Sequence, residues 1–355
     1  MEGMPLTSAK VKELARAAGF EISGIAAAEP LSDDFQRFQQ WREAGFAAEM
    51  SYLTDRRGDL RADPRNLLPS AKCIVCLGKL YNTSNPYSTA FQDKERGWIA
   101  RYAWGRDYHD VLREAVEKLL HLIRQEQALP FEWKICVDTA PLLERSYAQA
   151  AGLGWIGKNT CLINQQAGSW FLLAELLLSI SLDTDTAAPP RCGTCTRCID
   201  ACPTDAIRPA ANGGWALDSR LCLSYLTIEK RGVAPEETQS ATANHIFGCD
   251  ICQDVCPWNR RAATTEELAF QPLSFAPHLA ELAYFSEGDF RRIFRRSPVW
   301  RTKYEGFLRN VAVALGNSGK VEMKEPLQKL SAHDNELVAS TARAALARLE
   351  QALAV

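Results

Sequence analysis

Eight of the twelve cysteines in this 355-residue chain lie between positions 192 and 256, at spacings typical of iron–sulfur ligands. They form two runs, Cys192-Gly-Thr-Cys195-Thr-Arg-Cys198-Ile-Asp-Ala-Cys202-Pro203 and Cys249-Asp-Ile-Cys252-Gln-Asp-Val-Cys256-Pro257, with Cys222 between them. In a C-x₂-C-x₂-C-x₃-C-P run, three thiolates hold one 4Fe–4S cube and the fourth ligates a second cube. The second run lacks a leading cysteine, and Cys222 is its substitute.

This spacing predicts two ligand sets. One comprises Cys192, Cys195, Cys198 and Cys256, and the other comprises Cys202, Cys222, Cys249 and Cys252. Zinc also binds C-x₂-C pairs, but two tetrahedral zinc sites need neither the triple run nor the C-P ending. Disulfides need an oxidising compartment, and no segment of the sequence directs the chain to one. We therefore favour two 4Fe–4S clusters and keep zinc as the alternative.

The other four cysteines have a structural interpretation. Cys73 and Cys76 lie in an apolar run that is typical of a buried strand. An odd offset on a strand sends two side chains to opposite faces, so this pair is a poor chelate. Cys136 and Cys161 also lie in apolar segments, and a buried free cysteine behaves as a small hydrophobic residue.

Asp138 follows a strand pattern and precedes a helix pattern. Ligands collect at the carboxyl ends of strands in α/β sheets, so this carboxylate is a candidate acid or base. The alternative, a helix-capping aspartate, is the interpretation that the residues alone favour. Arg145 lies seven residues further on and could face the same crevice, although an ordinary surface arginine is its alternative.

Two further segments could approach a cofactor. Gly152-Leu-Gly-Trp-Ile-Gly-Lys-Asn159 follows a helix, so it is no dinucleotide fingerprint, but its glycines allow close approach to a flat group. Asp107-Tyr108-His109 is similar to the Asp-x-His start of a cobalamin motif. Leu112 stands where that motif has glycine, so we do not assign His109 as an axial ligand.

Alternating patterns predict the elements that position these residues. We expect helices over 8–20, 32–44 and 107–125 and from Pro141 onward, with Ser32 as a cap, and strands over 71–80, 131–138 and 169–180. A polar linker over 183–190 leads to the cysteine runs. Short helices over 306–315, 325–331 and 335–352 resemble HEAT-type units. The fold class is therefore α+β and multidomain, with an α/β domain over 1–182, a ferredoxin-like domain over 183–265 and HEAT-like helices over 266–355.

Composition bounds the class of protein. The chain is 46% hydrophobic and 24% charged with a net charge of −2, so as a whole it is not a basic nucleic-acid binder. No stretch approaches the roughly 18 apolar residues that span a bilayer. Free thiols without a targeting segment predict a cytoplasmic location.

One region is locally basic and contains few acidic residues. Opposite the apolar residues Phe290, Ile293 and Phe294 it carries Arg291, Arg292, Arg295, Arg296, Arg301, Lys303 and Arg309. Such density suits RNA phosphates, and a solvated helix face is the equally weighted alternative. A looser cluster comprises Arg56, Arg57, Arg61 and Arg65.

Taken together, the chain resembles the epoxyqueuosine reductase family over nearly its whole length. The resemblance rests on both cysteine runs and on the segments 101–109, Val137-Asp-Thr-Ala-Pro-Leu-Leu-Glu-Arg145, 151–159, Gly168-Ser-Trp170 and 222–229. It implies an N-terminal domain that binds base-off cobalamin, and it makes Asp138 the catalytic proton donor. The residues implied to contact cobalamin are Arg61, Arg101, Asp107, Asp138, Arg145, Lys158, Asn159, Ser169 and Ser224.

The implied reaction, the last step of queuosine biosynthesis, removes the epoxide oxygen of epoxyqueuosine at the wobble position of a tRNA anticodon stem-loop. It needs two protons and two electrons from an external one-electron donor, passed through the clusters to cobalt. We expect a monomer without a membrane partner. A reductive dehalogenase is one alternative, but it commonly carries a twin-arginine signal and gives no reason for the basic region. An electron-carrier subunit without cobalamin is the other.

Overall fold

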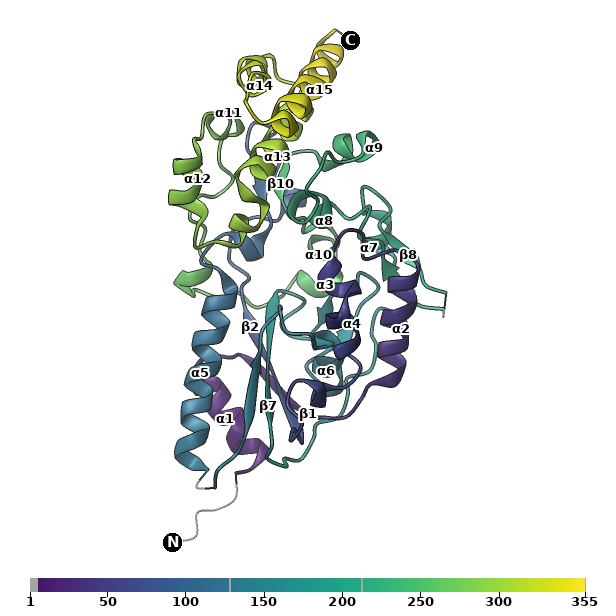
Figure 1. Ribbon diagram of the computed structural model, residues 1–355, viewed down its shortest axis with the longest axis vertical. Helices are drawn as coiled ribbons and strands as arrows, with labels where there is room; N and C mark the ends of the chain where they lie inside the picture. Colours follow the sequence, from purple (N-terminus) through teal and green to yellow (C-terminus); the bar gives the residue numbers. More distant parts are fainter. Residues whose placement is uncertain (1–5, 128, 212, 355) are drawn as a thin grey trace.

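The computed structural model describes residues 6–127, 129–211 and 213–354. Figure 1 shows an elongated molecule with a sheet and its helices at one end and the C-terminal helices at the other. The cysteine-rich segment lies beside the middle of the molecule. Among the helices of the described residues, none is long and apolar enough to cross a membrane.

The N-terminal half is built on a four-stranded sheet in the order β1-β2-β7-β4. These strands are β1 (Ile22–Ala27), β2 (Cys73–Leu80), β7 (Phe171–Leu178) and β4 (Trp133–Cys136). The three predicted strands are thus confirmed with shorter ends. Every neighbouring pair in this sheet is antiparallel, so the carboxyl-end rule for parallel α/β sheets does not apply. That part of the argument for Asp138 was wrong.

Helices cover both faces of the sheet. One face packs against α1 (Ser8–Ala18) and α5 (Tyr108–Glu126), whose apolar stripe meets the strands as its 3.6-residue period predicts. The other face packs against α6 (Glu144–Ala150). Cys73 belongs to the first core and Cys76 to the second, so the prediction that they point to opposite faces is confirmed.

Two helix starts differ from the sequence prediction. α2 (Ser32–Glu43) has no side-chain cap, because Ser32 is its first residue and not its cap. α6 begins at Glu144 instead of Pro141, because Asp138 has φ of 50° and the chain first forms a turn. Two short helices, α3 (Ser51–Thr54) and α4 (Arg56–Leu60), follow α2.

The middle of the chain consists of short elements joined by loops. They are β3 (Trp98–Ile99), β5 (Trp155–Ile156), β6 (Leu162–Ile163), α7 (Arg197–Asp200), β8 (Ile207–Pro209), β9 (Trp215–Leu217), α8 (Leu223–Ile228), α9 (Glu236–Gln239), β10 (His245–Phe247) and α10 (Ile251–Asp254). β10 pairs in parallel with β3, although about 150 residues separate them, so the cysteine-rich segment is fixed to the N-terminal half.

The C-terminal helices are α11 (Leu279–Leu282), α12 (Glu287–Phe294), α13 (Lys303–Asn317), α14 (Lys324–Ser331) and α15 (Glu336–Leu353). The three helices predicted here are confirmed. Their hydrophobic core also contains Trp98, Ile99 and Phe247. The cores therefore extend across the boundaries expected at 182 and 265, and the three-domain division stays a prediction.

Arg309 does not belong to a basic surface. Its side chain is 2% exposed, and its guanidinium donates to the carbonyls of Lys230, Gly232 and Leu226 at 2.6–2.9 Å and to Asn310. Burial lowers the pKa of Arg309 to about 10, so the group remains charged at neutral pH. Arg309 fixes α13 to the segment after α8, and its assignment to RNA was wrong.

Arg309→Lys should destabilise the protein although it keeps the charge. A lysine ammonium cannot reach four acceptors in a planar fork, so buried carbonyls lose their donors at a cost of about 2–4 kcal/mol. Denaturant unfolding of the variant measures this loss. Arg291→Lys, at an exposed position of α12, is the matched control and should leave the free energy of unfolding unchanged. Equal stability of both variants would contradict the structural role.

Candidate redox and proton-transfer site

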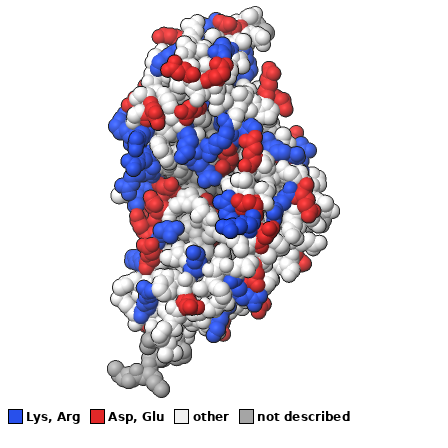
Figure 2. Space-filling model, viewed as in Figure 1, with Lys and Arg blue, Asp and Glu red and all other residues white. Residues whose placement is uncertain are grey.

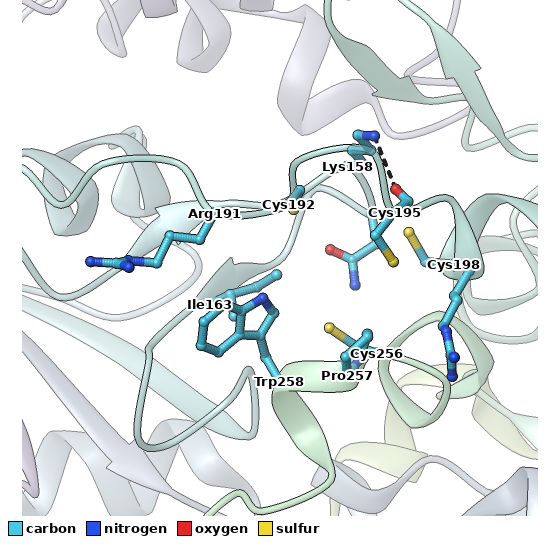
Figure 3. A pocket seen from close by; sticks show the side chains of 11 residues that line it. Lys158, Ile163, Arg191, Cys192, Cys195, Cys198, Cys256, Pro257 and Trp258 are labelled. Carbon is cyan, nitrogen blue, oxygen red and sulfur yellow. Dashed lines mark hydrogen bonds between the residues drawn. The ribbon is translucent and has the colours of Figure 1, made fainter.

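One group of cysteines lines a cavity of about 260 Å³. Cys192, Cys195 and Cys198 enter it from the first run and Cys256 enters it from the second. In Figure 3 these four side chains surround one space, and the ammonium of Lys158 donates to the carbonyl of Cys195 at 2.9 Å. Four thiols from two segments thus face one cavity.

The other four cysteines, Cys202, Cys222, Cys249 and Cys252, form a second group. Burial raises the pKa of Cys249, and the neighbouring Cys222 and Cys202 raise it further by charge repulsion. Cys249 and Cys222 act in the same way on Cys252. All twelve thiols of the chain are free, and in the described residues no three His, Cys, Asp or Glu side chains are placed to hold one metal ion.

Cys161 lies beside the second group of thiols. Its interaction with the thiol of Cys252 lowers the pKa of Cys161. For this residue the purely structural interpretation stays a prediction. It holds for Cys73, Cys76 and Cys136, which are at most 1% exposed, and burial raises the pKa of Cys136 to about 12.

A chain of three polar side chains joins α5 to the loop after β4. Asp107 caps α5, and its Oδ1 lies 2.7 Å from Nδ1 of His109. Nε2 of His109 lies 3.0 Å from Oδ2 of Asp138. Burial by itself would lower the pKa of His109, but the hydrogen bonds to the two carboxylates outweigh it and raise the pKa to about 9. The same bond outweighs burial at Asp138 and lowers its pKa.

The loop holds Asp138 in an unusual conformation. Its φ of 50° lies in the left-handed region, and its main-chain N–H donates to Oε1 of Glu144 at 2.7 Å. The N-cap of α6 is Leu143, so the helix-cap alternative for Asp138 was wrong. The carboxylate is free to face His109 and remains half exposed.

Aromatic and charged side chains from distant segments surround this chain. The ring of Tyr108 stacks on His109 with centroids 4.1 Å apart. Burial raises the pKa of Tyr102, and the charge of Asp138 adds to that effect. Arg301, which is paired with Glu229 at 3.1 Å, lowers the pKa of Asp138 by its charge. The sequence analysis did not predict that His109 bonds to Asp107 and Asp138, although the Asp-x-His spacing had drawn attention to this residue.

Several residues predicted to contact a cofactor form hydrogen bonds within the protein, and their contact with a cofactor stays a prediction. Arg101 is 1% exposed, and its guanidinium donates to the carbonyls of Thr83, Asn85 and Pro86. Ser169 exchanges hydrogen bonds with Gln253 and Asn259. Lys158 and Asn159 donate to carbonyls of the cysteine runs, the latter to Cys252 at 3.3 Å. Lys158, Asn159 and Ser169 thus join the N-terminal half to the cysteine-rich segment.

The remaining predicted residues lie closer to Asp138 or to the second group. Arg145 donates to the carbonyl of Thr160, next to Cys161. Arg61 is 8% exposed, and Glu144 is among the charged groups that act on its pKa. Burial raises the pKa of Cys222, and the main-chain N–H of Ser224 opposes that rise by hydrogen bonding to the sulfur.

The basic surface lies next to the polar chain. Arg106, Arg291, Arg292, Arg295 and Arg296 line a cavity of about 620 Å³, and Figure 2 shows Lys and Arg side chains gathered over α12. The main-chain N–H of Asp107 donates to the carbonyl of Arg296 at 2.7 Å. Phe290 and Phe294 are buried, so they cannot stack on bases. In the looser cluster, Arg57 and Arg65 form ion pairs with Asp55 and Asp63.

The α+β architecture with two groups of thiols is that of an iron–sulfur redox protein, as the family match of this segment shows. Residues 191–259 match the family model of the 4Fe-4S double cluster binding domain, and residues 61–139 match that of epoxyqueuosine reductase QueG. An epoxyqueuosine reductase of Xanthomonas campestris is 41% identical over 337 residues, 93% of both chains. The chain belongs to the epoxyqueuosine reductase family.

Further relatives agree with this membership. An epoxyqueuosine reductase of Escherichia coli is 39% identical over 312 residues, which cover 87% of this chain and 80% of the relative. A crystal structure of an epoxyqueuosine reductase with an epoxyqueuosine-modified tRNA-Tyr stem loop is 28% identical with a TM-score of 0.86 and covers 98% of this chain and 93% of that chain. A Bacillus subtilis enzyme, described with an aspartate-bearing catalytic loop swung out of the active site, has a TM-score of 0.85.

The pairing of His109 should make stability depend on pH. A histidine whose folded pKa is raised to about 9 stabilises the protein fully below the unfolded pKa, about 6.5, and this stabilisation is lost as pH rises through about 9. His109→Asn should therefore lower the free energy of unfolding at about pH 6, and its difference from the unmodified protein should shrink toward about pH 10. Denaturant unfolding across this range measures it.

His121→Asn is the matched control, because His121 is exposed on the same helix. It should change neither the stability nor its dependence on pH in this window. A constant difference between His109→Asn and the unmodified protein would contradict the ion pair.

Proposed function

We propose that this chain reduces epoxyqueuosine in tRNA to queuosine, using two 4Fe–4S clusters and cobalamin. The balanced reaction takes the epoxide, two electrons and two protons to an alkene and water. Membership of the epoxyqueuosine reductase family supports the substrate. The observation that carries the proposal is the hydrogen bond between Asp107 and Arg296, because it brings a basic surface against the side chains that can move a proton.

The two cysteine groups are proposed as the two cluster ligand sets. Their membership follows the spacing argument, with Cys256 in the first set and Cys202 in the second. Lys158 lines the cavity of the first set. A cluster held in this cavity would accept electrons from an external one-electron carrier. The second set is proposed as the one nearer the reaction, because Arg145, the residue after Glu144, donates to the carbonyl of Thr160 next to Cys161.

The residues around Asp138 fit base-off cobalamin. The polar side chains of Asp107, His109 and Asp138 remain 30–49% exposed, and tyrosine rings lie beside them. Amide groups at the edge of a corrin need such polar partners, and its flat faces need aromatic or small ones. Arg61, Arg145 and Ser224 are the further candidates for contact. When bound, cobalamin supplies a strongly reducing cobalt centre that can open an epoxide.

Asp138 is proposed as the acid that delivers protons to the leaving oxygen. Hydrogen bonding keeps it ionised beside a protonated His109, so the two groups together hold one transferable proton. The left-handed turn and the Glu144 bond aim the carboxylate away from α6. In the Bacillus subtilis relative, a catalytic loop identified by its aspartate is swung out of the active site.

The basic surface is proposed to hold the tRNA stem-loop. Arg291, Arg292 and Arg295 are exposed, and phosphate contacts of this kind position a nucleic acid without reading its sequence. We also propose the division into a cobalamin-binding domain over 1–182, a cluster domain over 183–265 and a HEAT-like domain over 266–355. In this arrangement the protein works as a monomer, with the substrate between the C-terminal helices and the sheet.

Asp138→Asn should abolish turnover while both cofactors stay bound. The amide has no proton to give, and a positioned acid contributes about 10²–10⁴-fold. The test incubates reduced, cobalamin-loaded protein with epoxyqueuosine tRNA and follows the loss of one oxygen mass from the nucleoside. Asp110→Asn, at the exposed position directly after His109, is the matched control and should keep full activity.

Two results would be decisive against the proposal. Unmodified protein with intact clusters and bound cobalamin that leaves the oxygen in place would overturn the function. Normal deoxygenation by Asp138→Asn would overturn the role of this residue.

Removing Arg291 and Arg295 together should weaken tRNA binding and reduce its dependence on salt. Each lost phosphate contact lowers the slope of log K against log salt by about 1. Fluorescence anisotropy with a labelled anticodon stem-loop at several salt concentrations measures this slope. Arg16 lies on α1 at the other end of the molecule. Arg16→Ala is therefore the control and should bind like the unmodified protein. An unchanged slope in the double variant would place the tRNA elsewhere.

A further inference from the structure

β7 carries one carboxylate in an otherwise apolar strand. Glu175 is 0% exposed, and neither of its carboxyl oxygens has a hydrogen-bond partner within standard distance among the residues that the structure describes. Its neighbours on the adjoining strands are Cys76 and Cys136, which are also buried. An ionised carboxylate in such surroundings would be very costly, so burial keeps this group protonated and raises its pKa far above the usual range.

The group that faces Glu175 is the first residue of α6. The carboxyl of Glu144 interacts with Glu175 and adds to the rise of its pKa. Burial raises the pKa of Glu144 itself to about 7, and the charge of Asp138 contributes to that rise. Because Oε1 of Glu144 lies 2.7 Å from the main-chain nitrogen of Asp138, this second carboxyl is next to the proposed proton donor.

Asp138 thus has a source of protons on either side. His109 lies on one side and is protonated up to about pH 9. Glu144 lies on the other side, with a pKa close to neutral pH, where an acid donates most effectively. The reaction consumes two protons, whereas a single carboxyl group can deliver only one before it is reloaded.

We propose that Glu144 supplies the second proton of the reaction through Asp138, and that Glu175 stabilises the Glu144 carboxylate that remains. This role rests on the proposed function. The first proton, held by His109 and Asp138, goes to the epoxide oxygen as its C–O bonds break and the alkene forms. The second passes from Glu144 to Asp138 and then to the hydroxide, which leaves as water. The proton on Glu175 stays in place and hydrogen-bonds the new carboxylate, so no bare charge is left in the core.

The other ionisable groups near this pair do not compete for the proton. The positive charges of Arg145 and Arg61 favour the Glu144 carboxylate after release. Cys76 and Cys136 stay protonated, because burial raises the pKa of both thiols. The charge of Asp138 acts in the opposite direction, since it favours the protonated form of Glu144.

Infrared spectra of the cobalamin-free protein test the protonation states without any turnover. The unmodified protein should show a carboxylic-acid carbonyl band that disappears as pH rises through about 7, and Glu144→Gln should lack it. Burial also raises the pKa of Asp250 to about 7, so the band is taken from the difference between the two proteins. Glu175→Gln should lack a second band that persists at higher pH. Spectra without these differences would overturn the proposal.

Turnover at several pH values tests the transfer. In the unmodified protein deoxygenation should slow as pH rises through about 7, because Glu144 loses its proton. Glu144→Gln keeps the acceptor for Asp138 but has no acid proton, so the rate should fall about 10- to 100-fold and this pH step should vanish. Glu175→Leu should move the step to higher pH, because nothing then stabilises the carboxylate. Glu175→Gln should move it back, since its amide donates a hydrogen bond.

Glu132→Gln, at an exposed position beside the same sheet, is the matched control and should retain the profile of the unmodified protein. An unchanged rate and pH step in Glu144→Gln would overturn the role of Glu144. A purely structural role would lower the rate of the Glu175 variants equally at all pH values, without a moved step and without rescue by glutamine. If the unmodified protein does not deoxygenate tRNA, the proposed function fails, and the infrared spectra still decide the protonation of the pair.

Discussion

Charge held away from water is the constraint on which the arrangement of this molecule depends. Two arginines, Arg101 and Arg309, are almost fully buried, and their terminal guanidinium nitrogens donate to main-chain carbonyls of other segments. Neither has a carboxylate as its direct partner in these bonds. Because each unpaired donor or carbonyl would cost about 1–3 kcal/mol, these two side chains fix loops that carry no regular structure of their own. The cysteine-rich segment therefore keeps its shape through polar contacts as much as through its small apolar cores.

These contacts bring the site together from three parts of the chain. Parallel pairing of β10 with β3 fixes the cysteine-rich segment to the N-terminal half. The bond from Asp107 to the carbonyl of Arg296 fixes the end of α12 to the start of α5. Asp138 follows β4, and its bonds to His109 and Glu144 join it to α5 and α6. These bonds determine where its carboxylate lies.

The sequence predicted those features that depend on neighbours along the chain. Cysteine spacing indicated two thiol groups, and periodicity indicated α5 and β7, because ligand loops and amphipathic elements are local. It could not reveal the burial of Arg309, whose partners lie about 80 residues away, or the left-handed turn that delays α6. Glu175 was a visible signal that was overlooked, since one carboxylate within eight otherwise apolar residues has no structural explanation as a strand former.

Proton supply sets a requirement that electron supply alone does not meet. A carboxylate bonded to a protonated imidazole is ionised, so Asp138 can act as an acid only if a proton returns to it from a neighbour. Its two neighbours differ in a useful way. His109 is 30% exposed and can exchange its proton with solvent, whereas Glu175 is buried in the core. In the proposed mechanism Glu144 and the buried Glu175 keep a proton available next to Asp138.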